Sequence, residues 1–452
     1  MIAIAALAVL FFSSINCQVI NTEVQRTIDL TGPIVKITAD IKATNIEKEY
    51  EIIFPDSQAK QLAYLTVTKK GKTIPTTAPV SANNITSFSI QLPDSTAALK
   101  VVAVFTDLLT PYPSEIGQHD NQLVLFANSH YFLSPYSTQS QKTTLKLSSS
   151  QIESYTKLDP QNARGSSIIF GPYKEIGPME VSPLSVHYVN NKPFAKFSTL
   201  SREVEVSHWG NIAVEELYEL QHKGAKLKEG FSRFEYMMRR SSDSPAFRSL
   251  RAVLPIQANN IYYRDQIGNI STSDIKFDES DGVLELLIET RFPLFGGWQT
   301  QFYLGYSIPT EVALFTVEDG RYKLKFDYFT VFEDVWVEDM ETKIVLPEGC
   351  TDIQVNVPYA VEQTWSRRFT FLDSVLNGGR PVVTLKAKKL VPEHDEKIVV
   401  SYRFDKSKMI VEPVMIIACY FLFFLLCTII VRFDTTKATV VGEKSDFVTD
   451  SK

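Results

Sequence analysis

An uncharged apolar run near the end of the chain limits what this sequence can fold into more than any other feature. The run extends from Val414 to Val431 and contains eighteen residues without a charge. A helix of that length spans about 27 Å at a rise of about 1.5 Å per residue, which matches the hydrocarbon layer of an endoplasmic reticulum membrane. Helices buried in soluble enzymes rarely run so long without a charge. The sequence therefore predicts one transmembrane helix over residues 409–431, with a buried helix of a soluble enzyme as the alternative.

The amino-terminal end of the chain is also apolar. Residues 2–12 form a short hydrophobic stretch, and Cys17 follows it closely. Eleven apolar residues are too few to cross a membrane, so residues 1–17 are interpreted as a secretory signal peptide rather than as a second span. Together the two segments predict a single-pass type I protein of the endoplasmic reticulum membrane. Its residues 18–408 lie in the lumen, and residues 432–452 form a short cytosolic tail.

Charge and cysteine usage narrow the class of protein. The formal net charge is −6, which argues against nucleic acid as a partner because nucleic-acid-binding proteins present a basic face. Cys350 is the one cysteine predicted to lie in the lumen, since Cys17 leaves with the signal peptide and Cys419 and Cys427 lie in the span. No intrachain lumenal disulfide is expected, which suits a protein kept inside a complex better than an exposed receptor. We expect a buried thiol at Cys350, with a bridge to a partner as the alternative.

Alternating apolar and polar residues predict that the lumenal part is β almost throughout. Val35, Ile37, Ala39 and Ile41 alternate with polar residues, and similar runs recur as far as Phe404. A period of two indicates strands with one buried face, and glycine and proline interrupt the runs at short intervals. A lumenal part of about 390 residues is too long for one ordinary domain, so two domains are expected.

The lumenal sequence also repeats itself once. Five pairs of segments occur in the same order in the two halves: GPIVKITADI from Gly32 and GNIAVEELYEL from Gly210, FPDSQAKQLAYL from Phe54 and LPIQANNIYY from Leu254, KTTLKL from Lys142 and ETKIVL from Glu341, Pro172-Tyr173 and Pro358-Tyr359, and Pro193 and Pro381. The repeat predicts a mainly β fold with two related β-sandwich-like domains, over residues 18–198 and 199–408, followed by the one transmembrane helix. Chance similarity between β sequences is the alternative.

The sequence lacks four motifs that are typical of catalytic, metal-binding or phosphate-binding sites. HExxH, GxSxG, CxxC and glycine-rich phosphate loops are absent, and the six histidines are scattered without a second ligand at metal spacing. A carboxylate pair could be drawn from Glu333-Asp334 and Glu338-Asp339, but both flank a strand-like segment, which favours surface charge. We therefore expect no catalytic residue, no metal ion and no cofactor in this chain.

Two sequons, Asn84-Ile85-Thr86 and Asn269-Ile270-Ser271, lie in turn-like surroundings. Because both are predicted to face the lumen, we expect N-glycosylation at Asn84 and Asn269, with chance matches as the alternative. Glycans at these positions would make the chain a substrate of glycosylation, which by itself says nothing about its function.

The segment from Ile261 to Pro309 is densely aromatic. Gly296-Gly297 ahead of Trp298 predicts a sharp bend at a place where side chains would clash. A packed core with a tight corner is the main interpretation of this segment. A partner-binding patch is the sharper hypothesis, because interfaces favour Trp, Tyr and Arg, and its candidate residues are Arg291, Trp298 and Tyr306.

The chain resembles the ribophorin I family, whose members form subunit 1 of the oligosaccharyltransferase complex of the endoplasmic reticulum. The segments that carry the resemblance are VSHWGNIAVEE (206–216), FSRFEY (231–236), YYRDQIGNISTS (262–273), RFPLFGGWQTQFYLGY (291–306), KIVLPEG (343–349) and the terminal span. The resemblance is strongest over the second predicted lumenal domain and the span. Longer members carry a folded cytosolic region after the span, and the short tail here gives no reason to expect a ribosome-facing role.

The resemblance implies a non-catalytic part in protein N-glycosylation. The family's complex transfers a preassembled glycan from dolichyl diphosphate to Asn of Asn-x-Ser/Thr in nascent polypeptides, and catalysis belongs to a separate multi-spanning subunit with a WWDYG motif that this sequence lacks. This chain would support assembly and the retention or presentation of acceptors. Its implied partners are the catalytic subunit, the other subunits, nascent polypeptides and the lipid bilayer. Tyr420 and Thr428 are candidates for packing the span against other helices.

A single-pass surface receptor or adhesion protein with two β-domains is the alternative function. Topology alone allows it, but the lack of lumenal disulfides and a tail without signalling features disfavour it. A membrane-tethered hydrolase is a third hypothesis, which would require a catalytic constellation that the sequence lacks.

Overall fold

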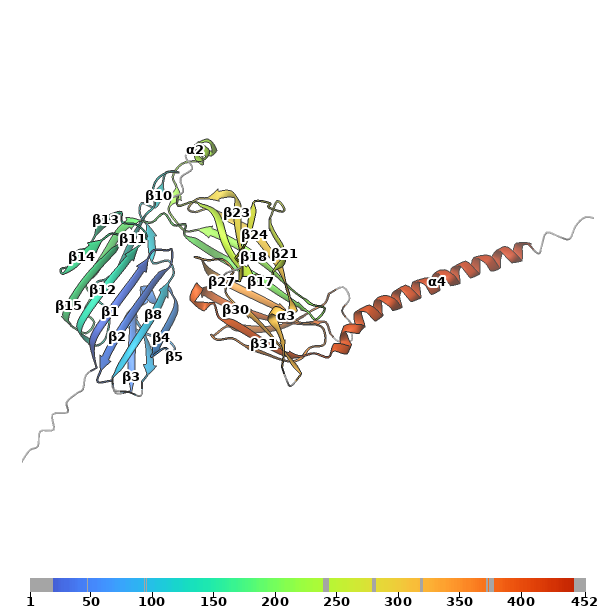
Figure 1. Ribbon diagram of the computed structural model, residues 1–452, viewed down its shortest axis with the longest axis horizontal. Helices are drawn as coiled ribbons and strands as arrows, with labels where there is room; N and C mark the ends of the chain where they lie inside the picture. Colours follow the sequence, from blue (N-terminus) through green and yellow to red (C-terminus); the bar gives the residue numbers. More distant parts are fainter. Residues whose placement is uncertain are drawn as a thin grey trace, which may run out of the picture.

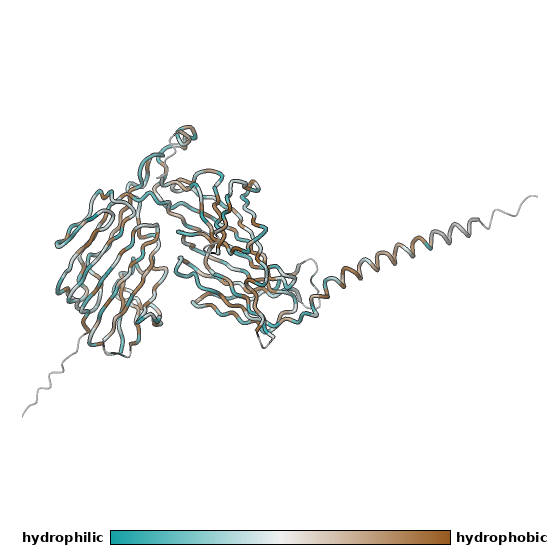
Figure 2. The backbone as a smooth tube through the Cα atoms, in the orientation of Figure 1, coloured by the Kyte–Doolittle hydropathy of each residue, from teal (hydrophilic) through white to brown (hydrophobic). Residues whose placement is uncertain are grey.

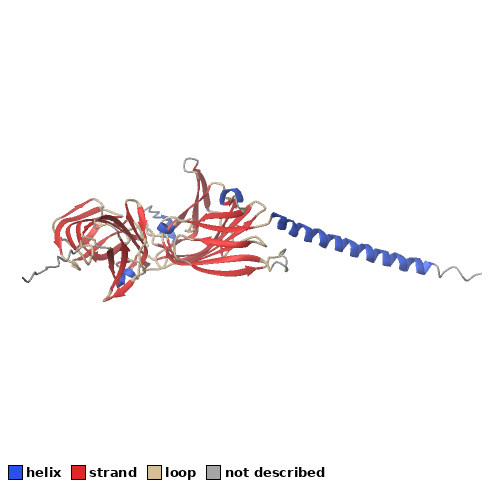
Figure 3. Ribbon diagram, turned by 90° about the horizontal axis from the view of Figure 1, so that it is seen from below, coloured by secondary structure: helices blue, strands red, loops and turns tan. Residues whose placement is uncertain are grey.

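A computed structural model describes residues 19–442 apart from 47, 93, 95, 239–243, 279–281, 318, 319, 371, 372 and 374–377. Two β domains lie side by side, and one long helix extends away from the second of them (Figure 1). The same division is visible after a quarter turn (Figure 3). The predicted signal peptide and the last ten residues of the predicted tail lie outside the described residues. The predicted fold class, mainly β with two related domains and one candidate membrane helix, is confirmed.

The first domain is built around an eight-stranded sheet. Its order is β14-β15-β12-β1-β2-β8-β4-β5, and a four-stranded sheet β13-β16-β11-β9 and a three-stranded sheet β3-β7-β6 share its hydrophobic core. The elements are β1 (Ile20–Leu30), β2 (Val35–Thr44), β3 (Glu49–Pro55), α1 (Asp56–Ala59), β4 (Leu62–Lys69), β5 (Lys72–Ile74), β6 (Val80–Ala82), β7 (Ile85–Gln91), β8 (Ala97–Phe105), β9 (Leu109–Pro111), β10 (Glu115–Ile116), β11 (Leu123–Ser129), β12 (Ser137–Leu147), β13 (Ile152–Tyr155), β14 (Gln161–Arg164), β15 (Ser167–Ile176) and β16 (Pro183–Val189).

The second domain is built around a seven-stranded sheet. Its order is β21-β24-β18-β17-β27-β30-β29, with a three-stranded sheet β20-β23-β22 and a four-stranded sheet β25-β26-β31-β28 on the shared core. The elements are β17 (Ala195–Ser207), β18 (Asn211–His222), β19 (Lys226–Leu227), α2 (Arg233–Met238), β20 (Phe247–Pro255), β21 (Asn259–Asp265), β22 (Ser273–Asp278), β23 (Val283–Leu294), β24 (Gln299–Pro309), α3 (Thr310–Ala313), β25 (Leu314–Thr316), β26 (Arg321–Asp327), β27 (Trp336–Val345), β28 (Thr351–Asn356), β29 (Glu362–Arg368), β30 (Arg380–Leu390), the 3-10 helix η2 (Pro392–His394) and β31 (Lys397–Arg403).

Period-two patterning explains why these segments form strands. The exposure of successive side chains in β2 and in β18 alternates between buried and accessible along the whole strand. The four apolar residues of the predicted pattern in β2, from Val35 to Ile41, all face the core. One face of each large sheet is therefore apolar and must be covered, and the smaller sheets cover it.

The two domains share one topology. Reading the large sheets as β14-β15-β12-β1-β2-β8-β4 and β29-β30-β27-β17-β18-β24-β21 pairs each strand of the second domain with one that holds the same place in the first. In both domains the first strand runs parallel to a partner from later in the sequence, β1 to β12 and β17 to β27. The smaller sheets match strand for strand as well. The predicted relationship between the domains is therefore a repeat of strand order as well as of sequence.

Three of the five predicted segment pairs lie on equivalent strands, and two do not. Pro172 lies in β15, whose counterpart is β30, whereas Pro358 lies between β28 and β29; Pro193 precedes β17, whereas Pro381 lies in β30. A proline or a dipeptide is too short to mark a strand, because proline recurs at many turns and edges. The longer pairs hold because each contains several inward-facing positions.

The linker between the domains is short. Residues 195–198 belong to β17 and pair with β18, so the predicted boundary after residue 198 falls inside a strand of the second domain. We place the boundary in residues 190–194, between β16 and β17. Sequence patterning missed it because apolar residues alternate with polar ones in both β16 and β17, and only a few residues separate the two strands.

The domains also contact each other away from the linker. In one region β10 pairs in parallel with β19, and the side chain of Gln122 donates to Asn190 in the linker and accepts from the N–H of Ala225 in the second domain. In a second region Trp336 and Val391 of the second domain pack against Val104 of the first. Both regions hold the domains against each other.

Helix α4 (Val411–Gly442) leaves the second domain through the 3-10 helix η3 (Lys406–Ile410). Residues Lys406–Phe433 are long enough and apolar enough to cross a membrane, and the most apolar window makes no buried contact with the described domains. The apolar part of the helix, brown in Figure 2, stands clear of both domains. The predicted span, residues 409–431, begins with the last two residues of η3, and α4 continues past residue 431 to Gly442.

Candidate functional site

The predicted aromatic segment runs through β21, β23 and β24, and its glycine pair forms a tight corner. Gly297 has a φ of +81°, and a Cβ on Gly296 would lie 1.8 Å from the carbonyl oxygen of Ala225. The corner touches the link between the domains, where Lys226 and Gly296 form an isolated bridge. A side chain at Gly296 would therefore separate two backbones that hold the domains in place.

The structure does not bring the three predicted interface residues together. Arg291 makes a two-pronged ion pair with Asp265, one bond of which is 2.8 Å long, and this pairing holds the pKa of Asp265 below its ordinary value. Trp298 is half-buried, with its ring 5.5 Å from that of Phe295. Tyr306 is 7% exposed and faces the interior of the second domain. Arg291 and Trp298 remain predicted interface residues, whereas Tyr306 belongs to a cavity described below.

Both predicted glycosylation sites lie on exposed turns. Asn84 precedes β7 and has a φ of +62°, and Asn269 follows β21. The hydroxyl of Thr86 is buried and donates to Asp56 at 2.7 Å, whereas Ser271 is exposed. The folded chain therefore presents the whole sequon of Asn269 and hides the hydroxyl of the other sequon.

The two predicted packing residues of the span differ in what they offer a neighbouring helix. Tyr420 is 63% exposed, so its ring and hydroxyl are open to a partner or to lipid. The hydroxyl of Thr428 donates to the carbonyl oxygen of Phe424 at 2.8 Å, one turn earlier in the same helix. Thr428 thus resembles a valine in outline, because its donor is already used.

Cys350, which was expected to be a buried thiol, is partly buried. It follows the turn in which its N–H donates to the carbonyl of Pro347, and it packs against the core of the second domain. Burial raises the pKa of this thiol to about 12, so it stays protonated and unreactive.

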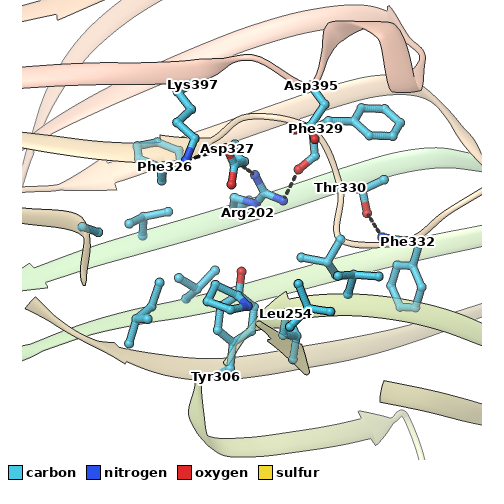
Figure 4. Close-up of a pocket in the computed structure, with 18 of the residues that line it drawn as sticks. Arg202, Leu254, Tyr306, Phe326, Asp327, Phe329, Thr330, Phe332, Asp395 and Lys397 are labelled. Carbon is cyan, nitrogen blue, oxygen red and sulfur yellow. Dashed lines mark hydrogen bonds and ion pairs between the residues drawn. The ribbon is translucent and has the colours of Figure 1, made fainter. Parts of the chain in front are cut away.

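A cavity of about 750 Å³ lies inside the second domain, between the seven-stranded sheet and the smaller sheets. Apolar side chains make up much of its wall: Val204, Ile212, Val214, Leu254, Ile308 and Leu324. Arg202, Asp327, Asp395 and Lys397 gather on one side of it, across from Leu254 (Figure 4). A volume of this size is typical of a ligand-binding site and far larger than an ordinary packing defect.

Each domain buries one arginine beneath its smaller sheets. Arg26 on β1 and Arg202 on β17 are 4% and 3% exposed, and each faces a threonine of the parallel partner strand. Arg26 donates to the carbonyl oxygens of residues 129–131, and Arg202 donates to those of residues 327–329. The register of β11 and β26 makes these two sets of carbonyls equivalent. The repeat therefore preserves a buried arginine that binds three successive carbonyl groups.

The two arginines differ in their charge partner. Glu216 on β18 is fully buried and accepts hydrogen bonds from Arg202 and from Tyr218, whereas the equivalent place on β2 holds Ala39. Within the described part of the chain, Arg26 pairs with no carboxylate. Burial lowers the pKa of Arg26 to about 9; burial alone would also lower the pKa of Arg202, but Glu216 outweighs it and raises that pKa above its ordinary value.

Neither arginine was predicted from the sequence. The available signal was a charged residue at an inward position of an alternating strand, between Val24 and Ile28 in one case and between Leu200 and Val204 in the other. Such a residue must find partners inside the domain, because an unpaired buried charge is very costly.

In the first domain, aromatic rings occupy the space that is left open in the second domain. Strand register pairs three buried phenylalanines with three smaller residues that line the cavity: Phe54 with Leu254, Phe105 with Ile308, and Phe126 with Leu324. A fourth pair, Phe132 and Thr330, lies three residues after the ends of the equivalent strands β11 and β26. One change runs the other way, since Ala103 is the counterpart of Tyr306. The cavity is therefore a property of the second domain and not of the shared fold.

Tyr306 adds one polar group to the cavity. Its side chain lines the cavity, and its hydroxyl makes no hydrogen bond within the described part of the chain. Burial raises the pKa of Tyr306, so the group stays a neutral O–H that can donate or accept. Burial, together with Asp327, also raises the pKa of Asp395 across the cavity. This arrangement suits an elongated, mainly apolar ligand with a polar group.

The acidic pair Glu333-Asp334 is exposed at the opening of this cavity, as predicted for surface charge, and Glu333 pairs there with Arg251 at 2.7 Å. No cluster of three or more His, Cys, Asp and Glu side chains in the described residues could hold a metal ion.

Comparison with known proteins extends over nearly the whole chain. The sequence model of the ribophorin I family matches residues 19–431. Subunit 1A of the dolichyl-diphosphooligosaccharide–protein glycosyltransferase of Arabidopsis thaliana is 40% identical over 96% of this chain and 73% of its own length. Subunit 1B of the same organism is 38% identical over 94% of both chains, and subunit 1 of the Caenorhabditis elegans enzyme is 37% identical over 91% of this chain and 72% of its own.

Likeness to solved structures is much weaker. Yeast LTA4 hydrolase is 11% identical over 38% of this chain and 29% of its own, with a TM-score of 0.25, and carries no argument about function. The family match, in contrast, covers both β domains and the span, and the relatives are aligned over more than two thirds of their length. The chain belongs to the ribophorin I family.

Proposed function

We propose that this chain is a non-catalytic subunit of the oligosaccharyltransferase, held in the endoplasmic reticulum membrane by α4 with both β domains in the lumen. The relatives are named as subunits 1, 1A and 1B of the dolichyl-diphosphooligosaccharide–protein glycosyltransferase, and family membership makes this chain a subunit of that enzyme as well. Its partners are the other subunits, and we infer that the catalytic one is a separate multi-spanning protein. The names of these relatives support this role over that of a surface receptor or adhesion protein.

A transfer assay tests the non-catalytic part of this proposal. The purified full chain in nanodiscs, given dolichyl-linked glycan and an acceptor peptide with an Asn-x-Thr sequon, should form no glycopeptide, whereas the complete complex should form it. Glycopeptide formed by the chain alone would refute the assignment. Depletion of the chain should also reduce assembly of the complex, and normal assembly without it would refute the structural role.

We further propose that the cavity of the second domain retains an apolar stretch of the acceptor polypeptide. The enzyme acts on two substrates, one of which is a protein, and the lumenal side is where a nascent chain emerges. The cavity lies in a lumenal domain and is open, mostly apolar and edged by charges of both signs, which suits side chains of an extended segment. The internal comparison with the first domain is the observation that carries this proposal, because the same fold has filled the equivalent space with phenyl rings.

Site-specific photocrosslinking tests the retention of acceptors. A photoreactive amino acid in place of Val283, which lines the cavity, should crosslink to a stalled nascent chain in the assembled complex. The matched control is Ile85, which holds the equivalent place in the first domain. The double variant Leu254→Phe and Leu324→Phe, which restores the rings of the first domain, should remove the crosslink from residue 283 without preventing assembly. Equal crosslinking from residue 85, or a crosslink that survives the double variant, would contradict retention in the cavity.

A further inference from the structure

The end of the second domain from which α4 departs carries three exposed apolar side chains from separate parts of the chain. Trp209, at the tip of the β17–β18 hairpin, is 63% exposed; Phe369, just after β29, is 59% exposed; and Ile410, in η3, is 60% exposed. We propose that this rim, defined as Trp209, Phe369 and Ile410, is seated in the headgroup layer of the bilayer that α4 crosses, with Trp209 as the main contact.

The three residues lie around the start of the helix. Trp209, Met409 and Glu412 line one small cavity of about 70 Å³, so the hairpin tip touches the junction between η3 and α4. Phe369 lies against Gly379, because a Cβ on Gly379 would come within 3.2 Å of the Phe369 ring. The next residue, Arg380, binds Glu412 in the first turn of α4. The rim is thus continuous with the segment that enters the membrane.

The junction is held firmly enough to fix the rim at one depth. Arg380 at the start of β30 binds three carboxylates: Asp373 at 2.9 Å, Glu205 of β17 at 2.7 Å and Glu412 of α4 at 3.3 Å. The Asp373 side chain is fully buried, and burial alone would raise the pKa of Asp373, but the hydrogen bonds from Thr370 and Arg380 outweigh it and leave that pKa below its ordinary value. In addition, Asp405 caps η3 by accepting from the N–H of Ser407 at 3.0 Å. One arginine therefore ties the large sheet to the first turn of the helix.

The position of the apolar run sets that depth. Ile410 and Glu412 precede Val414, where the run begins, by four and two residues, which is about 6 Å and 3 Å along the helix axis. The headgroup layer on each side of a bilayer is about 5–7 Å thick. Side chains packed beside residues 410–412 therefore lie within that layer and outside the hydrocarbon.

The chemistry of the rim matches this layer. Tryptophan concentrates at membrane interfaces because its ring is largely apolar while its indole N–H needs a hydrogen-bond partner. The indole N–H of Trp209 makes no hydrogen bond within the described part of the chain, so a lipid headgroup or interfacial water is free to accept one from it. A protein partner would also cover an apolar rim, but the direct continuation of this rim into the membrane helix favours lipid.

Quenching of tryptophan fluorescence by brominated phospholipid tests the proposal. The full chain is placed in nanodiscs that contain phosphatidylcholine brominated close to the headgroup, and four tryptophans report. We expect lipid-dependent quenching that is mostly lost in Trp209→Phe and retained in Trp298→Phe. Trp298 is the matched control because it lies far from Trp209. Trp298 directly precedes the first residue of β24, whereas the last residue of β24 pairs with the residues just after Trp209, about 35 Å away along the strand.

Two outcomes would overturn the proposal. The first is lipid quenching that is the same in Trp209→Phe as in the unaltered chain. The second is protection of Trp209 from both brominated lipid and aqueous iodide in the assembled complex, which would identify a protein as the occupant. Since Trp209 is mostly exposed, Trp209→Phe should leave folding intact, and unchanged circular dichroism verifies this. Phe369→Ser provides an independent variant that should raise the access of iodide to Trp209.

Discussion

Removing the carboxylate from the buried Arg202–Glu216 pair should lower the stability of the second domain and leave that of the first domain unchanged. The change is Glu216→Gln, which keeps the side-chain shape and the acceptor for Tyr218 but leaves the guanidinium of Arg202 without its counter-charge. Both partners are essentially buried, at 3% and 0% side-chain exposure. Breaking a buried pair typically costs about 3–5 kcal/mol, which is a large fraction of the ~5–15 kcal/mol that stabilises a domain.

The repeat places the expected cost at the lower end of that range. Arg26 shows that this fold accepts a buried arginine that binds three carbonyl groups and no carboxylate within the described residues. We therefore expect a loss of about 3 kcal/mol for Glu216→Gln. With a denaturant dependence of about 2 kcal/mol per molar urea, the midpoint of the second domain should fall by about 1.5 M. Arg202→Met should cost more, because it leaves Glu216 and three carbonyl oxygens without donors.

Hydrogen exchange in urea, resolved by peptide, measures this effect on the full chain in nanodiscs. Peptides from β17 and β18 should lose protection at lower urea in Glu216→Gln, while peptides from β1 and β2 should not change. The control is Glu23→Gln, which removes an exposed partner of Lys42 on the equivalent hairpin and should leave both midpoints unchanged. A shift in Glu216→Gln no larger than that of the control would refute the reasoning.

Three further predictions concern separate parts of the chain. Burial lowers the pKa of His222 to about 4, so between pH 6.5, the pKa of the unfolded chain, and pH 4 only the unfolded chain takes up this proton. The free energy of unfolding should therefore fall by up to ~1.4 kcal/mol for each pH unit between pH 6.5 and pH 4. Urea titrations at several pH values measure this slope, and His222→Gln should reduce it by one proton. Leu254→Phe fills empty space and should raise the melting temperature or leave it unchanged, as seen by calorimetry; a loss above ~2 kcal/mol would show that the space is not available. In the refolded, unglycosylated chain treated with the active complex, Asn269 should accept glycan and Asn84 should not, because the Thr86 hydroxyl is buried; mass spectrometry of both peptides decides, and equal occupancy would contradict the structure.

Local patterning revealed most of the fold. The strands that alternate from Val35 to Ile41 and from Ile398 to Phe404 form as predicted, because a period of two leaves one face that must be covered. The repeat was recognisable because segments such as KTTLKL and ETKIVL keep their inward positions. The apolar run was recognisable because no charge interrupts it.

The buried arginines and the cavity were not predictable from local pattern. The carbonyl partners of Arg26 and Arg202 lie more than 100 residues along the chain, and nothing near either arginine announces them. The cavity depends on four side chains that are smaller than the phenylalanines at the equivalent positions of the first domain. These residues lie on separate strands and in a loop, which only the strand register brings together. Tyr306 was singled out for its aromatic character, but its inward direction follows from its place opposite Val214.

The double contact between the domains has a mechanical consequence. A linker alone would let the first domain rotate freely, but the β10–β19 pair and the packing of Trp336 against the first domain both restrain it. Arg380 joins the second domain to the first turn of α4. Both domains and the start of the helix should therefore move as one body, so that any neighbour that binds the far end of the first domain would also set the tilt of the helix in the bilayer.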